Sequence, residues 1–327
     1  MYVLGIETSC DETAAAIVKD GSHVISNTVA SSLKFHRKYG GIVPEIASRK
    51  QLETITQVVE SALREAKVGL RNIGLVSVTC GPGLAGSLLV GISFAKSLSL
   101  ALDIPVLGIN HLHSHIYAGF LDKHKIAAPF IALVVSGGHT SLYQVLDFDK
   151  IKLLGATHDD ACGEAFDKVA KILKFGYPGG PIIERLARKG NSRAIKFKCS
   201  DTANPLDFSF SGIKTAVLYL VNAKRYPLNA KEDIAASFQE AVIDTLIKKS
   251  FLACKAKRIT RLVIGGGVAA NQRLRAKFYE QARDRKLDVY LPSKELCMDN
   301  AAMVAGLGYR LFRKGHVSDL TLSANSQ

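Results

Sequence analysis

Two segments of this chain repeat the same order of expected strands and turns. Residues 2–7 (YVLGIE) form an apolar run that precedes the polar turn TSCDET and the sequence AAAIVKDGSHVISNTV. Residues 130–136 (FIALVVS) precede the turn GGHT and the sequence SLYQVLDFDKIKLLGA in the same way. Each segment predicts strands separated by a short polar turn, and helical sequence follows each one. The chain therefore reads as an internal duplication of one α/β unit.

Strand and helix patterns alternate along the rest of the chain, which predicts an α/β architecture. A length of 327 residues and a 47% apolar content are ample for two cores. We expect an N-terminal lobe of residues 1–110 and a C-terminal lobe of residues 111–327 that carries the glycine-rich loops. This boundary is approximate, and the last helix, expected from about Asn300, can pack on the N-terminal lobe.

The charge of the chain favours a polyanionic partner. The sequence has 43 Lys and Arg residues against 29 Asp and Glu residues, a formal net charge of +14. Nucleic acid is the obvious partner of such a chain, although a generally basic soluble surface accounts for the charge equally well. The basic residues are partly clustered: Lys34, Arg37 and Lys38; Arg185, Arg188, Lys189, Arg193, Lys196 and Lys198; Lys255, Lys257, Arg258 and Arg261.

Cysteine usage and the apolar tracts predict a soluble, cytoplasmic protein. The six cysteines are scattered without a C-x-x-C pair, which favours reduced thiols over disulfides or a zinc ribbon. The N-terminus lacks the basic region of a secretion signal. The apolar tract 84–109 is interrupted by Lys96, Asp103 and Pro105, so we expect a buried helix and strand and no membrane contact.

The segment NHLHSH, residues 110–115, has the spacing of a two-histidine metal chelate. Asn110 is a plausible N-cap, and a helix beginning there places His111 and His115 on one face and His113 away from it. Two imidazoles do not make a tight site, so a third ligand must come from elsewhere in the chain. The segment also lacks the glutamate of H-E-x-x-H, which excludes a zincin peptidase.

Three glycine-rich turns stand between expected strands and helices: SGGHT (136–140), PGGP (178–181) and GGGVAAN (265–271). Glycine lets a backbone approach phosphate closely, while N–H groups and helix N-termini receive the negative charge. A single cluster of this kind is more often an ordinary tight turn. Three in one chain favour a nucleotide ligand.

These motifs together resemble the TsaD/Kae1/Qri7 family, most closely its bacterial branch, the tRNA N6-adenosine threonylcarbamoyltransferases. The resemblance runs nearly end to end, through VLGIETSCDET, GGIVPEIASR, GPGLAGSLLVG, NHLHSH, VSGGHT, GEAFDK, YPGGP, FSFSGIKT, GGGVAAN and CMDNAAM. It implies the two-lobed actin, sugar-kinase and Hsp70-like (ASKHA) fold, built from duplicated ribonuclease-H-like units. It also implies transfer of a threonylcarbamoyl group from L-threonylcarbamoyl-adenylate to N6 of adenosine 37 in tRNAs that read A-starting codons, with release of AMP.

The resemblance supplies the missing ligand, since the family's metal-binding positions match His111, His115 and Asp299. Without it, Asp299 would be taken as the N-cap of the helix that follows. Two imidazoles and one carboxylate suit one Fe2+ per subunit, and Zn2+ can occupy the same set.

The resemblance also implies the substrate-binding positions. Substrate binding is expected at Val134 and Val135, and the backbone amides of Ser136, Gly137 and Gly138 are expected to hold the acyl-phosphate part. Adenosine is expected at Asp167, Gly180, Glu184 and Asn271, although Glu184 stands where Asp is common in the family. No residue is assigned as catalytic: the candidates are Asp11, Glu12 and His139, and each has a purely structural alternative in a turn.

The resemblance implies partners as well: tRNA, a TsaB-like inactive paralogue and a TsaE-like P-loop ATPase, or a second copy of the chain in a homodimer. Two other readings remain. An ASKHA small-molecule kinase or ATPase would use magnesium carboxylates, against which the histidines argue. A non-catalytic scaffold paralogue would be expected to lack the metal residues, and all three are present.

Overall fold

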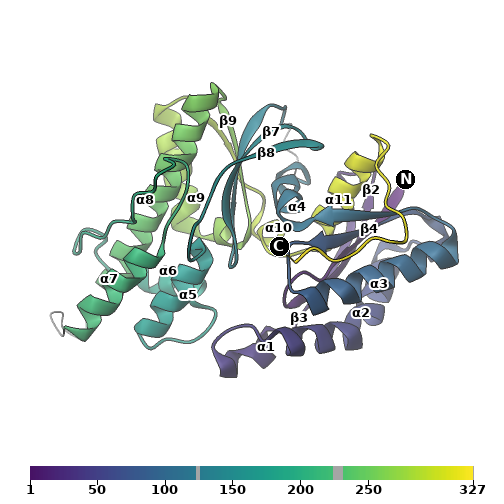
Figure 1. The fold of residues 1–327 in the computed structure, drawn as a ribbon, viewed down its shortest axis with the longest axis horizontal. Helices are drawn as coiled ribbons and strands as arrows, with labels where there is room; N and C mark the ends of the chain where they lie inside the picture. The colour runs from purple at the N-terminus through teal and green to yellow at the C-terminus, as the bar shows by residue number, and fades with distance from the viewer. Residues whose placement is uncertain (123–125, 224–230, 327) are drawn as a thin grey trace. The chain divides into compact units, whose positions relative to one another are not determined.

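The computed structural model describes residues 1–122, 126–223 and 231–326. The chain forms two compact units, coloured along the sequence in Figure 1. The first unit consists of Met1–Ile126 together with Glu295–Gln327, and the second consists of Ala127–Lys294.

A five-stranded sheet in the order β3-β2-β1-β4-β5 forms the centre of the first unit. β1 pairs antiparallel with β2 and parallel with β4, β2 pairs antiparallel with β3, and β4 pairs parallel with β5. The strands are β1 (Tyr2–Glu7), β2 (Glu12–Lys19), β3 (His23–Ser31), β4 (Ile73–Gly81) and β5 (Val106–Asn110).

The second unit repeats this sheet strand for strand, in the order β8-β7-β6-β9-β10. β6 pairs antiparallel with β7 and parallel with β9, while β7 with β8 and β9 with β10 repeat the remaining pairings. The strands are β6 (Phe130–Val135), β7 (Thr140–Asp147), β8 (Lys150–Ala156), β9 (Arg261–Gly265) and β10 (Asp288–Tyr290). The predicted α/β duplication is confirmed.

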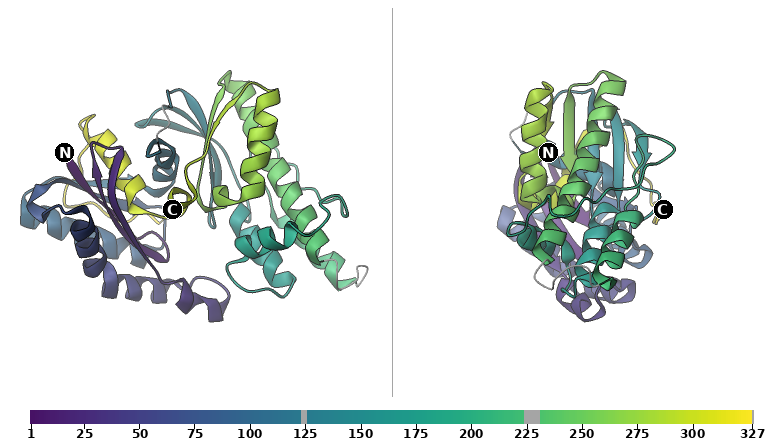
Figure 2. Two further views of the ribbon diagram at one scale, coloured as in Figure 1. Left: turned by 180° about the vertical axis from the view of Figure 1, so that it is seen from behind. Right: turned by 90° about the vertical axis from the view of Figure 1, so that its left-hand side faces the viewer.

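Helices cover both faces of the first sheet. Alternate residues of a strand point to opposite faces of the sheet. Leu4 and Ile6 of β1 point to the face covered by α2 and α3 and belong to the core with residues of those helices. Gly5 faces the other side, where a Cβ would lie 2.2 Å from the carbonyl oxygen of Ala301 at the start of α11. Figure 2 shows α11 beside these strands. The helices are α1 (Leu33–His36), η1 (Arg37–Tyr39), α2 (Pro44–Ala66), η2 (Leu70–Asn72), α3 (Ala85–Leu102), α4 (His111–Tyr117), η3 (Ala118–Phe120) and α11 (Ala301–Phe312).

The division of the chain differs from the expected boundary at residue 110. α4 follows that residue but belongs to the first unit, because it packs on α11. α11 itself returns to the first unit and packs on β1, β2 and β4. The first unit is therefore built from both ends of the sequence, and the second from its middle.

α3 is long and apolar enough to cross a membrane by length and composition. In the structure it packs on β4 and α2, and its residues Leu88, Ile92 and Ala95 are buried in the core. The tract 84–109 thus forms the expected helix and strand, but α3 is not a fully buried helix: 33% of it is buried, and Leu89 and Leu100 on its other side are exposed.

In the second unit, α8 is in contact with β6 and β9, and α6 packs on both α5 and α8. The helices of this unit are α5 (Cys162–Ile172), α6 (Gly179–Ala187), α7 (Ser211–Asn222), α8 (Lys231–Lys257), η5 (Gly267–Ala270) and α9 (Gln272–Asp284), and α10 (Lys294–Cys297) spans the boundary to the last segment.

Candidate metal centre and nucleotide-binding loops

The two candidate ligand histidines, His111 and His115, are held by a short capped helix. β5 ends at Asn110, whose side-chain oxygen accepts a hydrogen bond from the backbone N–H of His113 at 3.0 Å and so begins α4. His111 and His115 then lie one turn apart with their ring centroids 4.6 Å from each other. Both rings are buried. The predicted cap therefore positions both rings on one side of α4.

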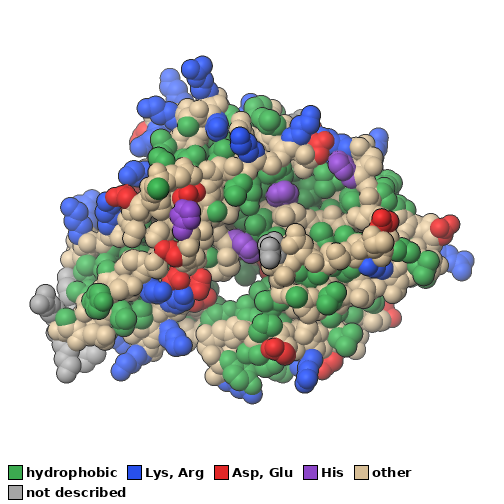
Figure 3. All heavy atoms as spheres, in the orientation of Figure 1, with side chains coloured by type: hydrophobic (Ala, Val, Ile, Leu, Met, Phe, Trp, Pro, Cys, Tyr) green, Lys and Arg blue, Asp and Glu red, His purple; other side chains and the backbone are tan. Residues whose placement is uncertain are grey.

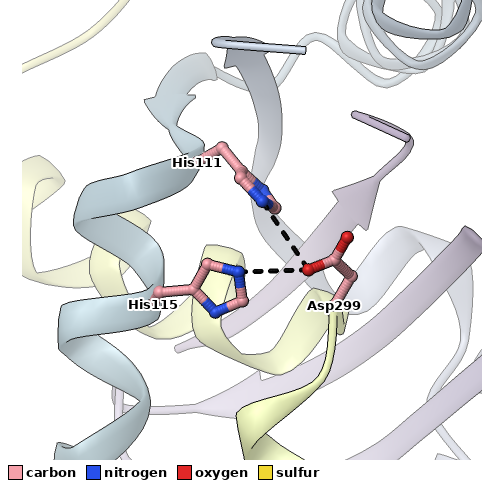
Figure 4. A group of neighbouring side chains, drawn as sticks. All are labelled: His111, His115 and Asp299. Atoms are coloured by element: carbon pink, nitrogen blue, oxygen red, sulfur yellow. Dashed lines mark ion pairs between the residues drawn. The ribbon is translucent and has the colours of Figure 1, made fainter. Parts of the chain in front are cut away.

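Asp299 lies directly in front of these rings (Figure 4). Its Oδ1 is 3.0 Å from Nε2 of His115 and 3.6 Å from Nε2 of His111. The helix that follows is capped by Asn300, whose side chain accepts from the N–H of Met303 at 3.1 Å. The carboxylate of Asp299 is thus not the cap of α11, and it points at the histidines.

The three residues fit a metal ion. Their ligand atoms all lie within 4.8 Å of one another. Neither ring nitrogen of buried His115 has a well-aligned hydrogen bond among the described residues, so Nε2 is positioned for another ligand. Imidazole nitrogens and a carboxylate oxygen are a common donor set for divalent transition metals. The cluster can therefore hold a metal ion.

A residue that sequence reasoning missed completes this centre. Glu7, at the end of β1, is buried, and its Oε2 lies 3.0 Å from Nδ1 of His111 and accepts from the hydroxyl of Thr79 at 2.6 Å. The other oxygen of Glu7 accepts from the N–H of Ser9. A carboxylate on Nδ1 fixes the orientation of a histidine ring and directs Nε2 towards the metal. The sequence feature that could have pointed to Glu7 is its position as a single acidic residue at the end of the apolar strand YVLGIE.

Neighbouring charges shift the pKa values of both His111 and Glu7. Burial alone would lower the pKa of His111, but the charges of Glu7 and Asp299 and the hydrogen bond to Glu7 raise that pKa to about 9. Burial would raise the pKa of Glu7, and the charge of His111 holds it below its usual value. Without metal, His111 is therefore in its positively charged form at neutral pH, with a proton on each ring nitrogen.

The candidate catalytic carboxylates lie where the turn after β1 meets β2: Asp11 ends the turn and Glu12 begins the strand. Burial, with the charges of Asp299 and Asp11, raises the pKa of Glu12 to about 10. The side chain of Asp11 is also buried, and its backbone oxygen accepts from both the N–H and the hydroxyl of Ser32. Burial also raises the pKa of the neighbouring Cys10 thiol. A bound cation would favour the ionised forms of these acidic groups.

His113 stays outside the cluster. Its ring is half-buried, and burial lowers its pKa. The cluster of potential ligands among the described residues contains His111, His115 and Asp299 only.

In the second unit, the backbone of the turn after β6 has free space beside it at Gly137 and Gly138. The N–H of Ser136 donates to the oxygen of His139 at 2.8 Å, and the hydroxyl of Ser136 accepts from the N–H of His139, which closes the turn. A Cβ on Gly137 or Gly138 would meet no described atom within 4 Å. Gly163, in the first turn of α5, approaches so closely that a Cβ there would lie 2.6 Å from the oxygen of Ser136. The turn can therefore receive a ligand on its outer side.

Three of the predicted adenosine positions, Asp167, Glu184 and Asn271, form hydrogen bonds with other residues of this unit. Oδ1 of Asp167 accepts from the N–H of Gly179 at 2.6 Å, and burial raises the pKa of this carboxyl. A Cβ on Gly180 would meet no described atom within 4 Å. Oε1 of Glu184 accepts from the N–H of Gln272 at 3.2 Å and from Arg188 at 2.8 Å.

Asn271 has structural partners on both sides of its amide. Its oxygen caps α9 by accepting from the N–H of Leu274 at 3.0 Å, and its NH2 group donates to Gln239 at 2.8 Å. Val134 and Val135 are fully buried in β6, so only their backbone can contact a ligand.

Comparison with known proteins identifies the family. A family model described as TsaD, tRNA N6-adenosine threonylcarbamoyltransferase, matches residues 23–306. The chain belongs to the TsaD family. It is 53% identical over 331 residues to the tRNA N6-adenosine threonylcarbamoyltransferase of Thermodesulfovibrio yellowstonii, covering 100% of this chain and 99% of that protein. The TsaD-family protein of the same description from Caldicellulosiruptor saccharolyticus is 50% identical over 327 residues, covering 99% and 97% of the two chains.

Solved structures show the same fold at low sequence identity. Component A of (R)-2-hydroxyglutaryl-CoA dehydratase from Acidaminococcus fermentans is 16% identical with a TM-score of 0.57, covering 95% of this TsaD-family chain and 98% of that chain. HypF from T. kodakarensis is 15% identical with a TM-score of 0.65, covering 96% of this chain and 48% of that one. The predicted ASKHA fold is therefore confirmed.

Proposed function

We propose that this chain transfers the threonylcarbamoyl group of L-threonylcarbamoyl-adenylate to N6 of adenosine 37 in tRNAs that read A-starting codons. The match to the TsaD family along the whole chain carries this proposal. N6 forms a bond to the carbamoyl carbon, and the bond from that carbon to the phosphate oxygen breaks. AMP leaves with the electron pair, and N6 loses one proton.

We propose that His111, His115 and Asp299 hold one Fe2+ ion, and that Zn2+ competes for the same ligands. The support is the donor set, in which three protein ligands leave positions open for a substrate oxygen. When bound, the ion supplies Lewis-acid stabilisation of negative charge on the departing group. Glu7 holds the ring of His111 in the orientation that this role requires.

The proposed substrate contacts are divided by chemical type. Backbone N–H groups at Ser136, Gly137 and Gly138 receive the acyl-phosphate oxygens, because oriented amides bind anions without a side chain. Val134 and Val135 contribute only main-chain atoms. Adenosine is proposed to contact the remaining four positions: Asp167, Gly180, Glu184 and Asn271.

The proton lost from N6 needs an acceptor, and the candidates are Asp11, Glu12 and His139. Glu12 is protonated at neutral pH in the metal-free chain, so it is a poor base there. A cation at the ligand cluster would favour its ionised form, because opposite charge lowers a carboxyl pKa.

We also propose that the chain acts in the cytoplasm with a TsaB-like paralogue and a TsaE-like P-loop ATPase, or as a homodimer. The two arrangements differ in a simple test. Addition of such partners should raise the transfer rate if they are required, whereas a homodimer is active alone.

The decisive experiment is transfer in vitro with synthetic threonylcarbamoyl-adenylate, unmodified tRNA and Fe2+, with the product nucleoside measured by mass spectrometry. His111→Ala, His115→Ala and Asp299→Ala should abolish transfer and bound metal together. His113→Ala should retain both, with a cost to the free energy of unfolding of about 1 kcal/mol or less. Elemental analysis of all four variants checks the metal.

Two results would contradict the proposal. Metal lost from His113→Ala, or retained in Asp299→Ala, would mean that the ligands are other residues. Turnover of ATP by the chain alone, without modification of tRNA, would favour the alternative of an ASKHA kinase or ATPase.

A further inference from the structure

The segment between β3 and α2 carries exposed aromatic rings among basic side chains. α1 and η1 follow one another here at the N-terminal end of α2 (Figure 1). Phe35 is 37% exposed and Tyr39 is 53% exposed. We call the following residues the aromatic-basic platform: Lys34, Phe35, Arg37, Lys38, Tyr39 and, from α2, Lys50. All but the half-buried Lys50 are exposed.

The cations of the platform lie over its rings. Nζ of Lys34 is 5.0 Å and Nζ of Lys50 is 4.9 Å from the centroid of Phe35. Nζ of Lys38 is 4.8 Å from the centroid of Tyr39. Each exposed ring therefore combines an apolar surface with a nearby positive charge, the two features that a nucleotide, with its flat base and phosphate, requires.

Most of this positive charge is unopposed. Among the residues that the structure describes, no carboxylate pairs with Lys34, Arg37 or Lys38, while Lys50 pairs with Glu53 at 2.6 Å. Lysines alone would suit an ordinary solvated face. Large rings exposed beside them are not needed for solubility, and together they indicate a binding surface for a polyanion with aromatic groups.

Buried hydrogen bonds hold the aromatic-basic platform to the rest of the first unit. His36, between Phe35 and Arg37, is fully buried; its Nε2 lies 2.9 Å from the hydroxyl of Ser32, and its Nδ1 accepts from the N–H of Val43 at 3.2 Å. Ser32 in turn donates its N–H and its hydroxyl to the backbone oxygen of Asp11 at 3.0 and 2.8 Å. Both rings are thus carried by a segment that is fastened to the turn bearing Asp11 and Glu12.

We propose that the aromatic-basic platform binds unpaired nucleotides of the RNA loop that contains the target adenosine, by stacking bases on Phe35 and Tyr39. This proposal rests on the proposed function for the identity of the RNA. Bases of a single-stranded loop can unstack and lie on a side-chain ring, whereas bases within a duplex cannot. The lysines and Arg37 contact the adjoining phosphates.

The test measures fluorescence anisotropy of two labelled RNAs, a hairpin with an unpaired loop and a fully paired duplex of equal length, across a range of salt concentrations. Replacing Phe35 and Tyr39 by Leu keeps apolar bulk but removes the rings. This double variant should bind the hairpin about tenfold more weakly or worse, with an unchanged salt slope and unchanged duplex affinity.

A second variant separates charge from stacking. Lys34→Gln with Lys38→Gln should weaken hairpin binding and lower the salt slope by about 1.4, the share of two phosphate contacts on a single strand. The matched control is Tyr219→Leu, which removes a 70% exposed ring from α7 of the second unit and should change neither value.

The outcomes distinguish the two proposals. Wild-type hairpin affinity in the Phe35 and Tyr39 variant, or equal losses for hairpin and duplex, would overturn stacking on the platform. Metal content and binding of an AMP analogue should stay at wild-type levels in the platform variants, and a loss of either would show a folding defect and overturn a local role. If the wild-type chain fails to modify tRNA but the ring variant still loses hairpin binding, the platform stands and the proposed function falls.

Discussion

Glu7 supports the proposed metal centre without contributing a ligand. Its two oxygens together contact His111, Thr79 and Ser9, and each contact lies in the buried interior of the first unit. An amide in its place can accept hydrogen bonds with one oxygen only, and it carries no charge to hold His111 in place. The strength of metal binding should therefore respond to this position.

We expect Glu7→Gln to weaken metal binding by about tenfold to a hundredfold, the range typical of residues that orient a ligand. Chelator competition measures the affinity, and circular dichroism checks the fold. The control is Glu65→Gln, which alters an exposed carboxylate on α2 that also accepts hydrogen bonds, from Thr28 and Ser61. Equal metal affinity in Glu7→Gln and wild type would remove Glu7 from the centre.

The pKa of His111 sets a second expectation. A ligand must lose its proton to bind metal, and the pKa of about 9 means that metal competes with a proton well above the ordinary value of 6.5. Metal affinity should keep rising between pH 6.5 and 9, by up to about tenfold per pH unit. A plateau from about pH 7 upward would show that His111 is already neutral there.

The stability of the metal-free chain should change with pH in the opposite direction to metal affinity: it should fall as pH rises. A raised folded-state pKa of His111 stabilises the fold fully below about pH 6.5, and this contribution is lost as pH rises through about 9. Thermal melting of the chelator-treated protein across that range measures the loss. His111→Gln, which has no titrating ring, should show a flatter profile.

At the scale of secondary structure, asparagine N-caps position the proposed metal ligands and one proposed nucleotide contact. Asn110, Asn271 and Asn300 each accept a hydrogen bond from the first turn of the helix that follows. In α4 and α11 the cap adjoins a proposed metal ligand, and in α9 the cap is itself a proposed nucleotide contact. The helix start and the binding position are therefore the same few residues in each case.

This overlap makes Asn271 a position where two roles must be separated by substitution. Asn271→Ala should lower the free energy of unfolding by about 1 kcal/mol through loss of the cap, and weaken binding of an AMP analogue. Asn271→Ser keeps a capping oxygen but has no amide. If calorimetry gives wild-type analogue affinity for the Ser variant, the amide does not contact the nucleotide.

The sequence predicted much of this at the level of elements. The repeated strand and turn pattern predicted the duplicated sheet, and the cap at Asn110 was visible as a short-range signal. Glu7 could not be assigned to this centre in the same way: its position at the end of an apolar strand is unusual for an acidic residue, but its partner His111 lies 104 residues away and the strand pattern does not name that partner. The return of α11 to the first unit was likewise only an open alternative, since helix periodicity does not name the sheet that a helix covers.

At the scale of the whole molecule, the charge of +14 is distributed over several exposed clusters. Figure 3 shows Lys and Arg side chains gathered over the outer end of α8, where Lys255, Lys257 and Arg258 are exposed. On α6 and just after it, Arg185, Arg188 and Lys189 are exposed as well, and Arg188 pairs with Glu184. A long polyanion can engage more than one such cluster.

We therefore expect tRNA binding to weaken steeply as salt rises. Arg185→Glu with Lys189→Glu should lower tRNA affinity while leaving the melting temperature unchanged, because both side chains are exposed and neither forms an ion pair within the described part of the chain. Filter binding at several salt concentrations measures this. Affinity that does not change between low and physiological ionic strength would rule out phosphate contacts as the main attraction.

Because α11 belongs to the first unit, that unit can be completed only at the end of synthesis. Residues up to 126 leave the ribosome first, yet the helix that covers one face of their sheet follows after the entire second unit. Asp299 emerges in the same late stretch, so the proposed ligand set of His111, His115 and Asp299 is complete only when synthesis is nearly finished. A chain released early by a stalled ribosome therefore lacks both the covering helix and one of the three proposed metal ligands.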